Sequence, residues 1–304
     1  GGAIGLNSNN IGMVVSDCSF FRTTANLGGG VALNFLNSDI SVSQCVFHET
    51  SSLSDGGGIY LYSRNKQVSV SDCVFNNTVS GDDGGGIYLF SSNYGFSVEG
   101  CLFSGCKTSD QGGAMYMSSN NDFSLVLRSN ITRCFAVRGG AIVVGSGHSL
   151  VQLVFVACCS FDNNKAGFGG AVYFGEYHNG IAVAASSFSS NSGDYGAALY
   201  ITQFNGGVSI TDSVLMLNSA SVQGGALFVL VEDLVVRDTT FSGNDASSSG
   251  AVYARVGAIS VLNCVFVGNE GPFGSHGGMY VEDAASVVVR STEFISNRAE
   301  SGGA

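Results

Sequence analysis

The chain has 304 residues, of which 45% are hydrophobic, 12% are charged and only one is proline. This composition excludes a disordered chain, which would be rich in charge, and the near absence of proline excludes collagen. The net charge of −11 argues against nucleic acid or an anionic membrane surface as a partner. The longest apolar run, near residues 150–159, is about half as long as a membrane-spanning helix requires, so we expect no membrane insertion.

A short glycine motif recurs along the whole chain, in which two glycines precede a small residue and an apolar one. Aligned on the second glycine, its strong and weak copies fall at positions 2, 29, 57, 85, 113, 140, 170, 196, 225, 250, 277 and 303. The mean step is about 27 residues. A period of this length indicates a stacked repeat protein rather than two separate globular domains.

A second landmark has the same period. A large apolar residue, mostly phenylalanine, occupies one equivalent position per repeat: Phe20, Phe47, Phe75, Phe103, Ile131, Phe161, Phe188, Leu215, Phe241, Phe266 and Phe294. Three residues after it the last six repeats place an asparagine: Asn164, Asn191, Asn218, Asn244, Asn269 and Asn297. The residues before it alternate between apolar and polar, which is the pattern of a strand.

These patterns predict an all-β fold, a right-handed single-stranded parallel β-helix (a solenoid) with about eleven rungs of about 27 residues and three short strands per rung. Like positions should stack, so that the six asparagines form a hydrogen-bonded ladder at a turn. We expect residues 1–304 to form one β-helix domain. The chain begins and ends at the same phase of the repeat, so we expect it to be an interior segment of a longer chain.

The glycine motif together with Phe-x-x-Asn resembles the repeats of the chlamydial polymorphic outer membrane proteins. Gly169-Gly170-Ala171-Val172 and Phe161-Asp162-Asn163-Asn164 are good matches, whereas the first five repeats have Thr or Cys in place of the asparagine. The resemblance spans the whole chain and is specific for the fold. It implies an extracellular or cell-surface protein with a structural or adhesive role.

Pectin-degrading enzymes share this architecture, so catalytic motifs need to be considered. Asp82-Asp83 resembles the paired aspartates of polygalacturonases, and Gly147-His148 resembles a fragment of their histidine motif. The other partners of that family are missing, and the aspartate pair precedes Gly84-Gly85, where other repeats have a turn. A solvated turn is therefore the preferred interpretation, and we expect no enzyme activity.

Nothing in the sequence indicates a cofactor or a metal site. The four histidines, His48, His148, His178 and His276, fall at unrelated phases of the repeat, and no pair has metal-ligand spacing.

Six of the nine cysteines lie two residues before the phenylalanine position, where serine and threonine also occur, so we expect them to be buried thiols. Cys106 and Cys134 instead occupy the asparagine position of adjacent repeats. Stacking should place their Cα atoms about 5 Å apart, within the range of a disulfide. Pairs of Cys18 with Cys45 and of Cys73 with Cys101 are alternatives to reduced thiols.

Two glycosylation sequons begin at Asn76 and at Asn130. Each asparagine neighbours the inward apolar position of its repeat, so both side chains should face outward. Their presence is compatible with secretion.

The strand after the glycines offers a candidate contact surface. Its inward positions are apolar, and the residue between them is aromatic in most repeats: Tyr60, Tyr88, Tyr116, Tyr173, Phe228, Tyr253 and Tyr280, interrupted by Val143 and Leu199. An exposed apolar stripe along a rod is typical of a contact surface. The alternatives are that loops of the same chain cover the stripe, or that its assignment to the outside is reversed.

Taken together, the sequence predicts a non-catalytic structural β-helix of an extracellular filament, appendage or surface stalk. Its expected partners are further copies of itself or another surface protein, with glycans as a further candidate. An adhesin passenger domain is the alternative, and a polysaccharide lyase or glycoside hydrolase is the least favoured interpretation.

Overall fold

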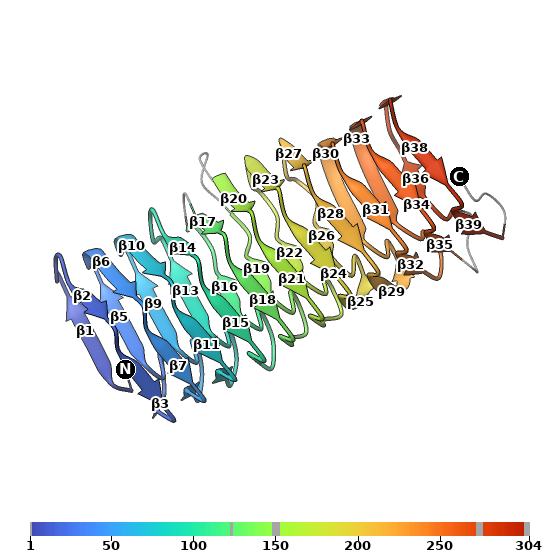
Figure 1. Cartoon of the computed structure of the whole chain (residues 1–304). Coiled ribbons are helices and arrows are strands. Elements are labelled where there is room, and N and C mark those ends of the chain that lie inside the picture. The colour runs from blue at the N-terminus through green and yellow to red at the C-terminus, as the bar shows by residue number, and fades with distance from the viewer. Residues whose placement is uncertain (1, 122–123, 148–152, 272–275, 301–304) are drawn as a thin grey trace.

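The computed structural model describes residues 2–121, 124–147, 153–271 and 276–300. Their strands form a parallel β-helix in which each strand pairs with the equivalent strand of the next turn, and every such pairing is parallel (Figure 1). One of its sheets holds a single strand per turn and has 11 strands. The all-β solenoid of about eleven turns that the repeat predicts is therefore confirmed.

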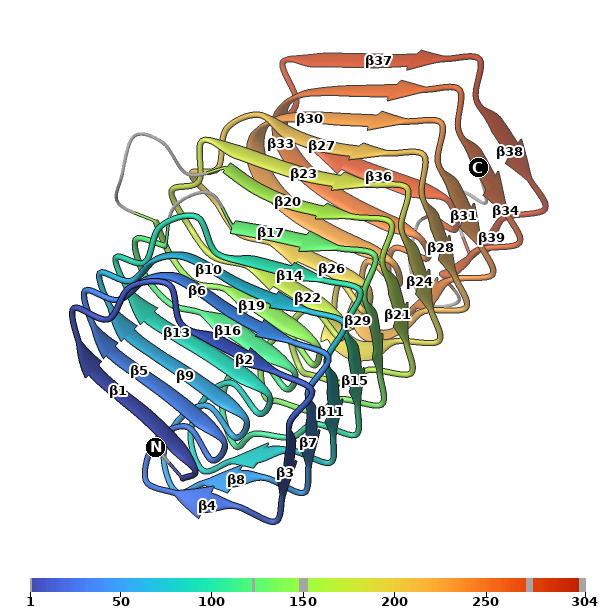
Figure 2. The same cartoon turned by 60° about the vertical axis from the view of Figure 1, so that its left-hand side comes forward.

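Each turn has four sides, which follow one another around the axis as β1, β2, β3 and β4 do in the first turn (Figure 2). The first two sides belong to one 20-stranded sheet, the third side is the 11-stranded sheet, and the fourth consists of a three-stranded and a five-stranded sheet. The sequence predicted three short strands per rung. The structure has four sides per turn, because a corner divides the part of each turn that lies in the 20-stranded sheet into two sides.

The first-side strands follow the glycine motif and are β1 (Ile4–Ser8), β5 (Val31–Phe35), β9 (Ile59–Ser63), β13 (Ile87–Ser91), β16 (Met115–Met117), β19 (Ile142–Val144), β22 (Val172–Phe174), β26 (Leu199–Ile201) and β36 (Met279–Glu282). The second-side strands are β2 (Val14–Ser16), β6 (Ser38–Ser43), β10 (Lys66–Ser71), β14 (Ser97–Glu99), β17 (Ser124–Leu127), β20 (Leu153–Ala157), β23 (Gly180–Ala184), β27 (Val208–Thr211) and β37 (Ser286–Arg290). Two longer strands, β30 (Leu227–Arg237) and β33 (Val252–Leu262), run through both sides.

The third-side strands are β3 (Ser19–Phe21), β7 (Val46–His48), β11 (Val74–Asn76), β15 (Leu102–Ser104), β18 (Asn130–Thr132), β21 (Ser160–Asp162), β24 (Ser187–Ser189), β28 (Val214–Met216), β31 (Thr240–Ser242), β34 (Val265–Val267) and β38 (Glu293–Ile295). The fourth-side strands are β4 (Thr24–Ala25), β8 (Ser51–Ser52), β12 (Val79–Ser80), β25 (Ser192–Tyr195), β29 (Ser219–Gln223), β32 (Asp245–Ala246), β35 (Glu270–Gly271) and β39 (Arg298–Ala299). Isolated parallel bridges at Lys107, Phe135 and Lys165 continue this side between its two sheets.

The core is built from ladders of identical residues. The phenylalanines of the third side stack face to face along the axis. The ring centroids of Phe47 and Phe75 are 4.6 Å apart, and those of Phe75 and Phe103 are 4.5 Å apart, with nearly parallel planes. This spacing is close to the distance between paired strands, so Phe75 contacts the rings of both adjacent turns, and the stack is interrupted only where Ile131 and Leu215 replace phenylalanine.

The six asparagines at the corner between the third and fourth sides form a hydrogen-bonded ladder. The Oδ1 atom of Asn218 accepts hydrogen bonds from the backbone N–H and the side-chain amide of Asn191, at 3.1 and 2.9 Å. The Nδ2 atom of Asn191 also donates to the carbonyl oxygen of Phe161. The ladder therefore provides partners for buried polar groups that the corner would otherwise leave unpaired.

A second asparagine ladder, which the sequence interpretation missed, lies at the corner between the first and second sides. Its members are Asn10, Asn37, Asn65, Asn93 and Asn121, and the Oδ1 atom of each member after Asn10 accepts a hydrogen bond from the backbone N–H of the preceding one. In a later turn the same type of bond runs from the backbone N–H of His178 to Oδ1 of Asn205.

Each glycine motif makes the corner between the fourth and first sides. Its first glycine, for example Gly56 or Gly84, has a positive φ of 65° or 62°, a conformation that other residues rarely adopt. A Cβ atom on the second glycine, Gly57, would lie 2.2 Å from the carbonyl oxygen of Gly85. The first position of the motif thus requires glycine because of its positive φ. The second requires glycine because the backbone of the next turn leaves no room for a side chain.

Candidate functional site

The aromatic residues predicted to form a stripe do stack along the first side. Ring centroids lie 5.6 Å apart for Tyr60 and Tyr88, and 5.3 Å apart for Tyr88 and Tyr116. After Val143 the stack resumes with Tyr173, Tyr200, Phe228, Tyr253 and Tyr280, at centroid distances of 4.6 to 5.6 Å. These rings lie on the opposite face of the sheet from the main core, whose nearest members are the inward residues of the same strands.

Of the alternatives that the sequence left open for this stripe, the structure favours the one in which the chain itself covers it. Tyr60 and Tyr88 are 3% and 5% exposed, Phe228 and Tyr253 are each 8% exposed, and Tyr116, Tyr173 and Tyr280 are half-buried. The rings bury one another by stacking, and the first three form a small separate apolar cluster with Ala32 and neighbouring side chains. The stripe faces away from the main core and is nevertheless covered.

Part of the cover comes from corner residues just before the first side: Phe168 and Tyr195 each precede a positive-φ glycine, and His276 precedes Gly277. Phe168 packs edge-on against Tyr200 at 5.4 Å, Tyr195 packs edge-on against Phe228 at 5.4 Å, and His276 lies 4.7 Å from Tyr280. Burial raises the pKa of Tyr200 to about 12, and burial with a hydrogen bond to Glu282 raises that of Tyr253 to about 12. The corner side chains therefore occupy the space that a partner would need.

The stripe also corrects the register of one repeat. The sequence alignment placed Leu199 among the aromatic residues, whereas the structure pairs Leu199 with Val172 in the core and Tyr200 with Tyr173 in the stripe. The cause is Gly196, which the alignment treated as a second glycine. Its φ of +55° makes it the first glycine of its motif, followed by Ala197 in the second position.

A smaller aromatic group that the sequence interpretation missed reaches the surface beside the stripe. Phe35 and Phe90 are 44% and 39% exposed, and Tyr62 lies half-buried between them. The rings of Tyr62 and Phe90 stack with centroids 5.0 Å apart, while Phe35 meets Tyr62 edge-on at 4.6 Å. These three residues, the outer aromatic group, are partly exposed at the surface.

Asp83, one of the paired aspartates, lies in the corner beside the stripe. Its Oδ1 atom accepts a hydrogen bond from the backbone N–H of Gln111 at 3.1 Å. Burial, followed by the negative charges of Asp110 and Asp55, raises the pKa of Asp83 to about 7. Asp82 accepts a hydrogen bond from the hydroxyl group of Ser54 in the preceding turn. Both carboxyl groups thus take part in contacts between turns.

The raised pKa of Asp83 predicts a pH-dependent stability. The folded chain holds this proton up to about pH 7, whereas an unfolded aspartate loses it near pH 4. The stability that this retained proton contributes to the folded chain is fully present below pH 4 and is lost as the pH rises toward 7. At pH 8 we expect the free energy of unfolding of Asp83→Asn to exceed that of the unaltered chain by about 1 kcal/mol. This value is smaller than the pKa shift alone would give, because the carboxyl group is partly exposed to solvent. Urea unfolding at pH 4 and pH 8 checks this; an equal stability difference at both pH values would contradict it.

The predicted disulfide does not form, because all nine cysteines, including Cys106 and Cys134, are free thiols in the structure. The two buried residues do occupy equivalent positions of adjacent turns, where the thiol of Cys106 donates to the carbonyl oxygen of Phe75 and the thiol of Cys134 to that of Thr132. Neighbouring side chains of a parallel ladder point the same way, so their Cβ atoms stay about as far apart as the strands, near 4.8 Å. A disulfide needs Cβ atoms about 3.8 Å apart.

Most of the remaining cysteines form a ladder with serine and threonine at the corner between the second and third sides. The thiol of Cys73 donates to the carbonyl oxygen of Ser71 at 3.2 Å. The hydroxyl group of Ser186 donates to the carbonyl oxygen of Ala184 at 2.8 Å. The alternative pairs of Cys18 with Cys45 and of Cys73 with Cys101 are free thiols as well. Burial raises the pKa of Cys45 to about 11, which keeps this thiol protonated.

The two sequons differ in accessibility. The side chain of Asn130 is exposed, whereas Asn76 is half-buried, with Nδ2 3.2 Å from Nδ1 of His48, and Thr78 of the same sequon is fully buried. We expect expression through a eukaryotic secretory pathway to add one glycan, at Asn130. Mass spectrometry of Asn130→Gln and Asn76→Gln variants checks this: only the first should lose a glycan, and loss in the second instead would contradict it.

The histidines do not come together. His178 is buried, and burial lowers its pKa to about 4. His48 is the last residue of β7, His276 lies at the corner before β36, and His148 lies outside the described residues. Within the described ranges, no group of three or more His, Cys, Asp or Glu side chains is placed to bind a metal. That part of the chain also contains no helix long and apolar enough to cross a membrane.

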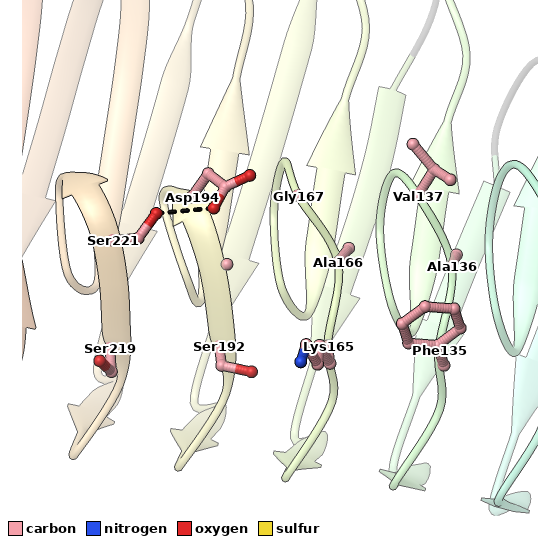
Figure 3. Close-up of a pocket in the computed structure, with 11 residues that line it drawn as sticks. Phe135, Ala136, Val137, Lys165, Ala166, Gly167, Ser192, Asp194, Ser219 and Ser221 are labelled. Atoms are coloured by element: carbon pink, nitrogen blue, oxygen red, sulfur yellow. Dashed lines mark hydrogen bonds between the residues drawn. The ribbon is translucent and has the colours of Figure 1, made fainter.

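The fourth side carries the hollow drawn in Figure 3, with a volume of about 490 Å³. Four of its lining residues lie in one row on successive turns, namely Phe135, Lys165, Ser192 and Ser219. In the view of Figure 3, Val137 lies above Phe135. Phe135 and Val137 are 45% and 49% exposed. The only polar contact drawn between its residues is the hydrogen bond from Ser221 to Asp194, at 2.6 Å.

One end of the hollow, at Phe135, Val137 and Lys165, lies in the part of the chain where positive charge is concentrated. Residues 107–165 contain five of the 12 Lys and Arg residues and three of the 23 Asp and Glu residues, so this segment carries a net charge of +2. Two of the three lysines in the chain, Lys107 and Lys165, lie on either side of Phe135 in the ladder of the fourth side. The sequence-based interpretation considered only the total charge and therefore missed this segment.

Comparison with known proteins supports the fold. A family model described as the right-handed β-helix region matches residues 1–103. No curated protein and no solved structure matches the chain. The match is to a β-helix repeat protein in general and does not extend to the chlamydial repeats.

Proposed function

We propose that the chain is a non-catalytic structural rod of an extracellular filament, appendage or surface stalk, and that it works through contacts along its length. The observation that carries this proposal is the persistence of the ladders. Stacked phenylalanines, hydrogen-bonded asparagines and the Cys/Ser/Thr corner recur from turn to turn through the described residues. Such a core makes a stiff rod, about 50 Å long for eleven turns.

The corners support the same proposal. Single residues with positive φ turn the chain between the second and third sides, such as Asp72 and Asp212, and between the third and fourth sides, such as Asn77 and Asn163. Corners this short leave the outer faces of the strands as the main surface of the molecule. A surface of that kind suits association with other molecules over a length of several turns.

The carboxyl groups that resemble a catalytic pair are explained by the ladder. Asp83 accepts a backbone hydrogen bond, and Asp82 accepts one from Ser54 of the preceding turn. The pKa of Asp83 follows from burial and the nearby carboxylates at that corner, which is a structural origin that requires no substrate.

The experiment combines imaging with an activity assay. Electron microscopy of the purified chain should reveal straight rods that join into pairs, bundles or fibres as the concentration rises. Incubation with polygalacturonate and with neutral polysaccharides should release no reducing ends and no unsaturated products. Cleavage that disappears in an Asp83→Asn variant would overturn the non-catalytic part of the proposal, and compact particles without any association would overturn the structural part.

The second candidate is an adhesive passenger domain, and the outer aromatic group favours it. Exposed rings of Phe35 and Phe90 on either side of Tyr62 offer flat apolar faces, of the kind against which sugar rings pack. A glycan array probed with the chain and with a Phe35→Ala/Phe90→Ala variant distinguishes this candidate. Binding by the unaltered chain that the variant loses would favour the adhesin.

A further inference from the structure

A second hollow lies at the corner between the fourth and first sides, beside β33 and β36 in the orange and red turns of Figure 1. Its volume is about 310 Å³, which is at the lower end of the range for small-molecule sites. All of its described lining residues are buried or half-buried. The hollow is therefore lined by side chains that the fold holds in place.

The hollow exists because the corner residues change in these turns. In earlier turns Phe168 and Tyr195 pack edge-on against the aromatic stripe of the following turn. The same position, two residues before the second glycine of the motif, is held by Gln223 and then by Ser248. Neither side chain has a ring, so space opens beside the stripe where the aromatic corner residues end.

The lining side chains carry hydrogen-bonding groups that the described part of the chain leaves unused. The hydroxyl group of Tyr253 donates to Oε2 of Glu282. Five further lining side chains form no hydrogen bond or ion pair with any described residue: Gln223, Ser248, Ser249, His276 and Tyr280. Ser249 is only 2% exposed, so its hydroxyl group depends for a partner on what fills the hollow.

These groups select a class of ligand. Amide, hydroxyl and imidazole groups can both donate and accept hydrogen bonds, whereas the carboxylate of Glu282 only accepts. A ligand with several hydroxyl groups matches this set, because each hydroxyl group is both a donor and an acceptor. An ammonium ligand has donors only and would leave the N–H and O–H groups without acceptors. An apolar ligand would leave all of these groups unpaired.

Charge narrows the class to uncharged ligands. Glu282 is the one charged residue among the described residues that line the hollow. Arg255, which lies in register with Glu282 on the neighbouring strand, is paired instead with Asp283, Nε to Oδ2 at 2.9 Å. The chain after residue 165 has four Lys and Arg residues and 12 Asp and Glu residues, a net charge of −8. A ligand that carries a carboxylate would therefore be repelled.

We propose that this hollow binds an uncharged hexose, free or as a unit of a glycan, through Gln223, Ser249 and Glu282. The half-buried ring of Tyr280, held 4.7 Å from the ring of His276, offers an apolar surface for the C–H groups of the sugar. This inference goes beyond the proposed structural function, because the hollow is formed within one chain and does not require rods to associate. The site is also separate from the outer aromatic group, which lies on β5, β9 and β13.

Saturation-transfer NMR with the full chain tests the class of ligand. The probes are the methyl glycosides of glucose, galactose and mannose, with galacturonate and tetramethylammonium as charged comparisons. At least one methyl glycoside should bind with a Kd on the order of 1 mM, as expected for a single small polar ligand, and the charged probes should not bind. Absence of binding by all three glycosides, or binding of a charged probe alone, would overturn this inference.

A variant that closes the hollow tests the place of binding. Gln223→Tyr introduces the residue that Tyr195 supplies one turn earlier, and it should weaken glycoside binding at least about tenfold. Gln203→Tyr, the same change at an exposed position outside this hollow, is the matched control and should leave binding unchanged. Equal binding by the folded Gln223→Tyr variant and by the unaltered chain would contradict the proposed site.

Amide chemical shifts of the ¹⁵N-labelled unaltered chain give a readout that does not depend on a variant. Addition of the bound glycoside should shift the amide signals of Ser248, Ser249 and Tyr253 most. Largest shifts in β5 and β13 would overturn this inference and favour the outer aromatic group as the sugar site. Either result leaves the structural rod untouched, because association of rods is measured separately by electron microscopy.

Discussion

Replacement of Phe75 by alanine should destabilise the rod by about 3–5 kcal/mol. The ring is fully buried between Phe47 and Phe103, which stack on its two faces at 4.6 and 4.5 Å. Removal of the ring leaves a cavity that neither neighbour can fill, because each is held by its own turn. The ring also packs on the backbone of Gly58, where an added Cβ atom would lie 2.9 Å from it.

Chemical denaturation measures this loss, and hydrogen exchange locates it. In a stacked repeat the defect should weaken its own turn and the adjacent turns most, so amide protection should fall first in β7, β11 and β15. Phe75→Leu is the matched control, because Ile131 and Leu215 occupy the same position in other turns. We expect it to cost about 1 kcal/mol. Equal effects of both substitutions would show that ring stacking does not hold the ladder together.

The ladders could be predicted from the sequence because stacking repeats the same environment in every turn. Phe47 and Phe75 are equivalent in the sequence and adjacent in space, so a period alone identifies a contact. The second asparagine ladder obeys the same rule, because Asn37 and Asn65 each lie ten residues before the phenylalanine of their repeat, as its other members do. The signal was therefore present in the sequence, and it was missed because only positions close to the phenylalanine were compared.

The exposure of the tyrosine stripe could not be predicted for a different reason. Alternation along a strand tells which face of the sheet a side chain occupies, and it does so correctly for Tyr60 and Tyr88. Whether that face is open to solvent depends on the corner residue of the preceding turn, such as Phe168, which packs edge-on against Tyr200. These residues differ from turn to turn, from aspartate to aromatic, so they have no period to detect.

The failure of the disulfide prediction has a related cause. Stacking fixes the separation of Cα atoms in successive turns, and Cys106 and Cys134 satisfy that criterion. It also fixes the direction of both side chains, which leave the ladder in parallel. Proximity in a β-helix therefore favours contacts that work between parallel side chains, namely stacked rings and hydrogen bonds from one amide to the next, over covalent bonds that need convergent ones.

Replacement of Asn218 by alanine tests the second kind of contact and should cost about 3–5 kcal/mol. Its Nδ2 atom donates to the carbonyl oxygen of Phe188 at 3.0 Å and to Oδ1 of Asn244 at 2.9 Å. Its Oδ1 atom accepts from the backbone N–H and the side-chain amide of Asn191. The substitution leaves these buried partners without water or protein to bind, which is more costly than the loss of an exposed hydrogen bond.

Asn130→Ala, in an exposed position of the third side, is the control and should change the free energy of unfolding by less than about 0.5 kcal/mol. Hydrogen exchange of the Asn191 amide gives the more specific readout, because this N–H donates directly to the side chain that is removed. We expect its protection to fall further than that of the strand amides in β24 and β28. If the Asn191 amide stayed protected while overall stability fell, packing rather than the ladder hydrogen bonds would be the main role of these asparagines.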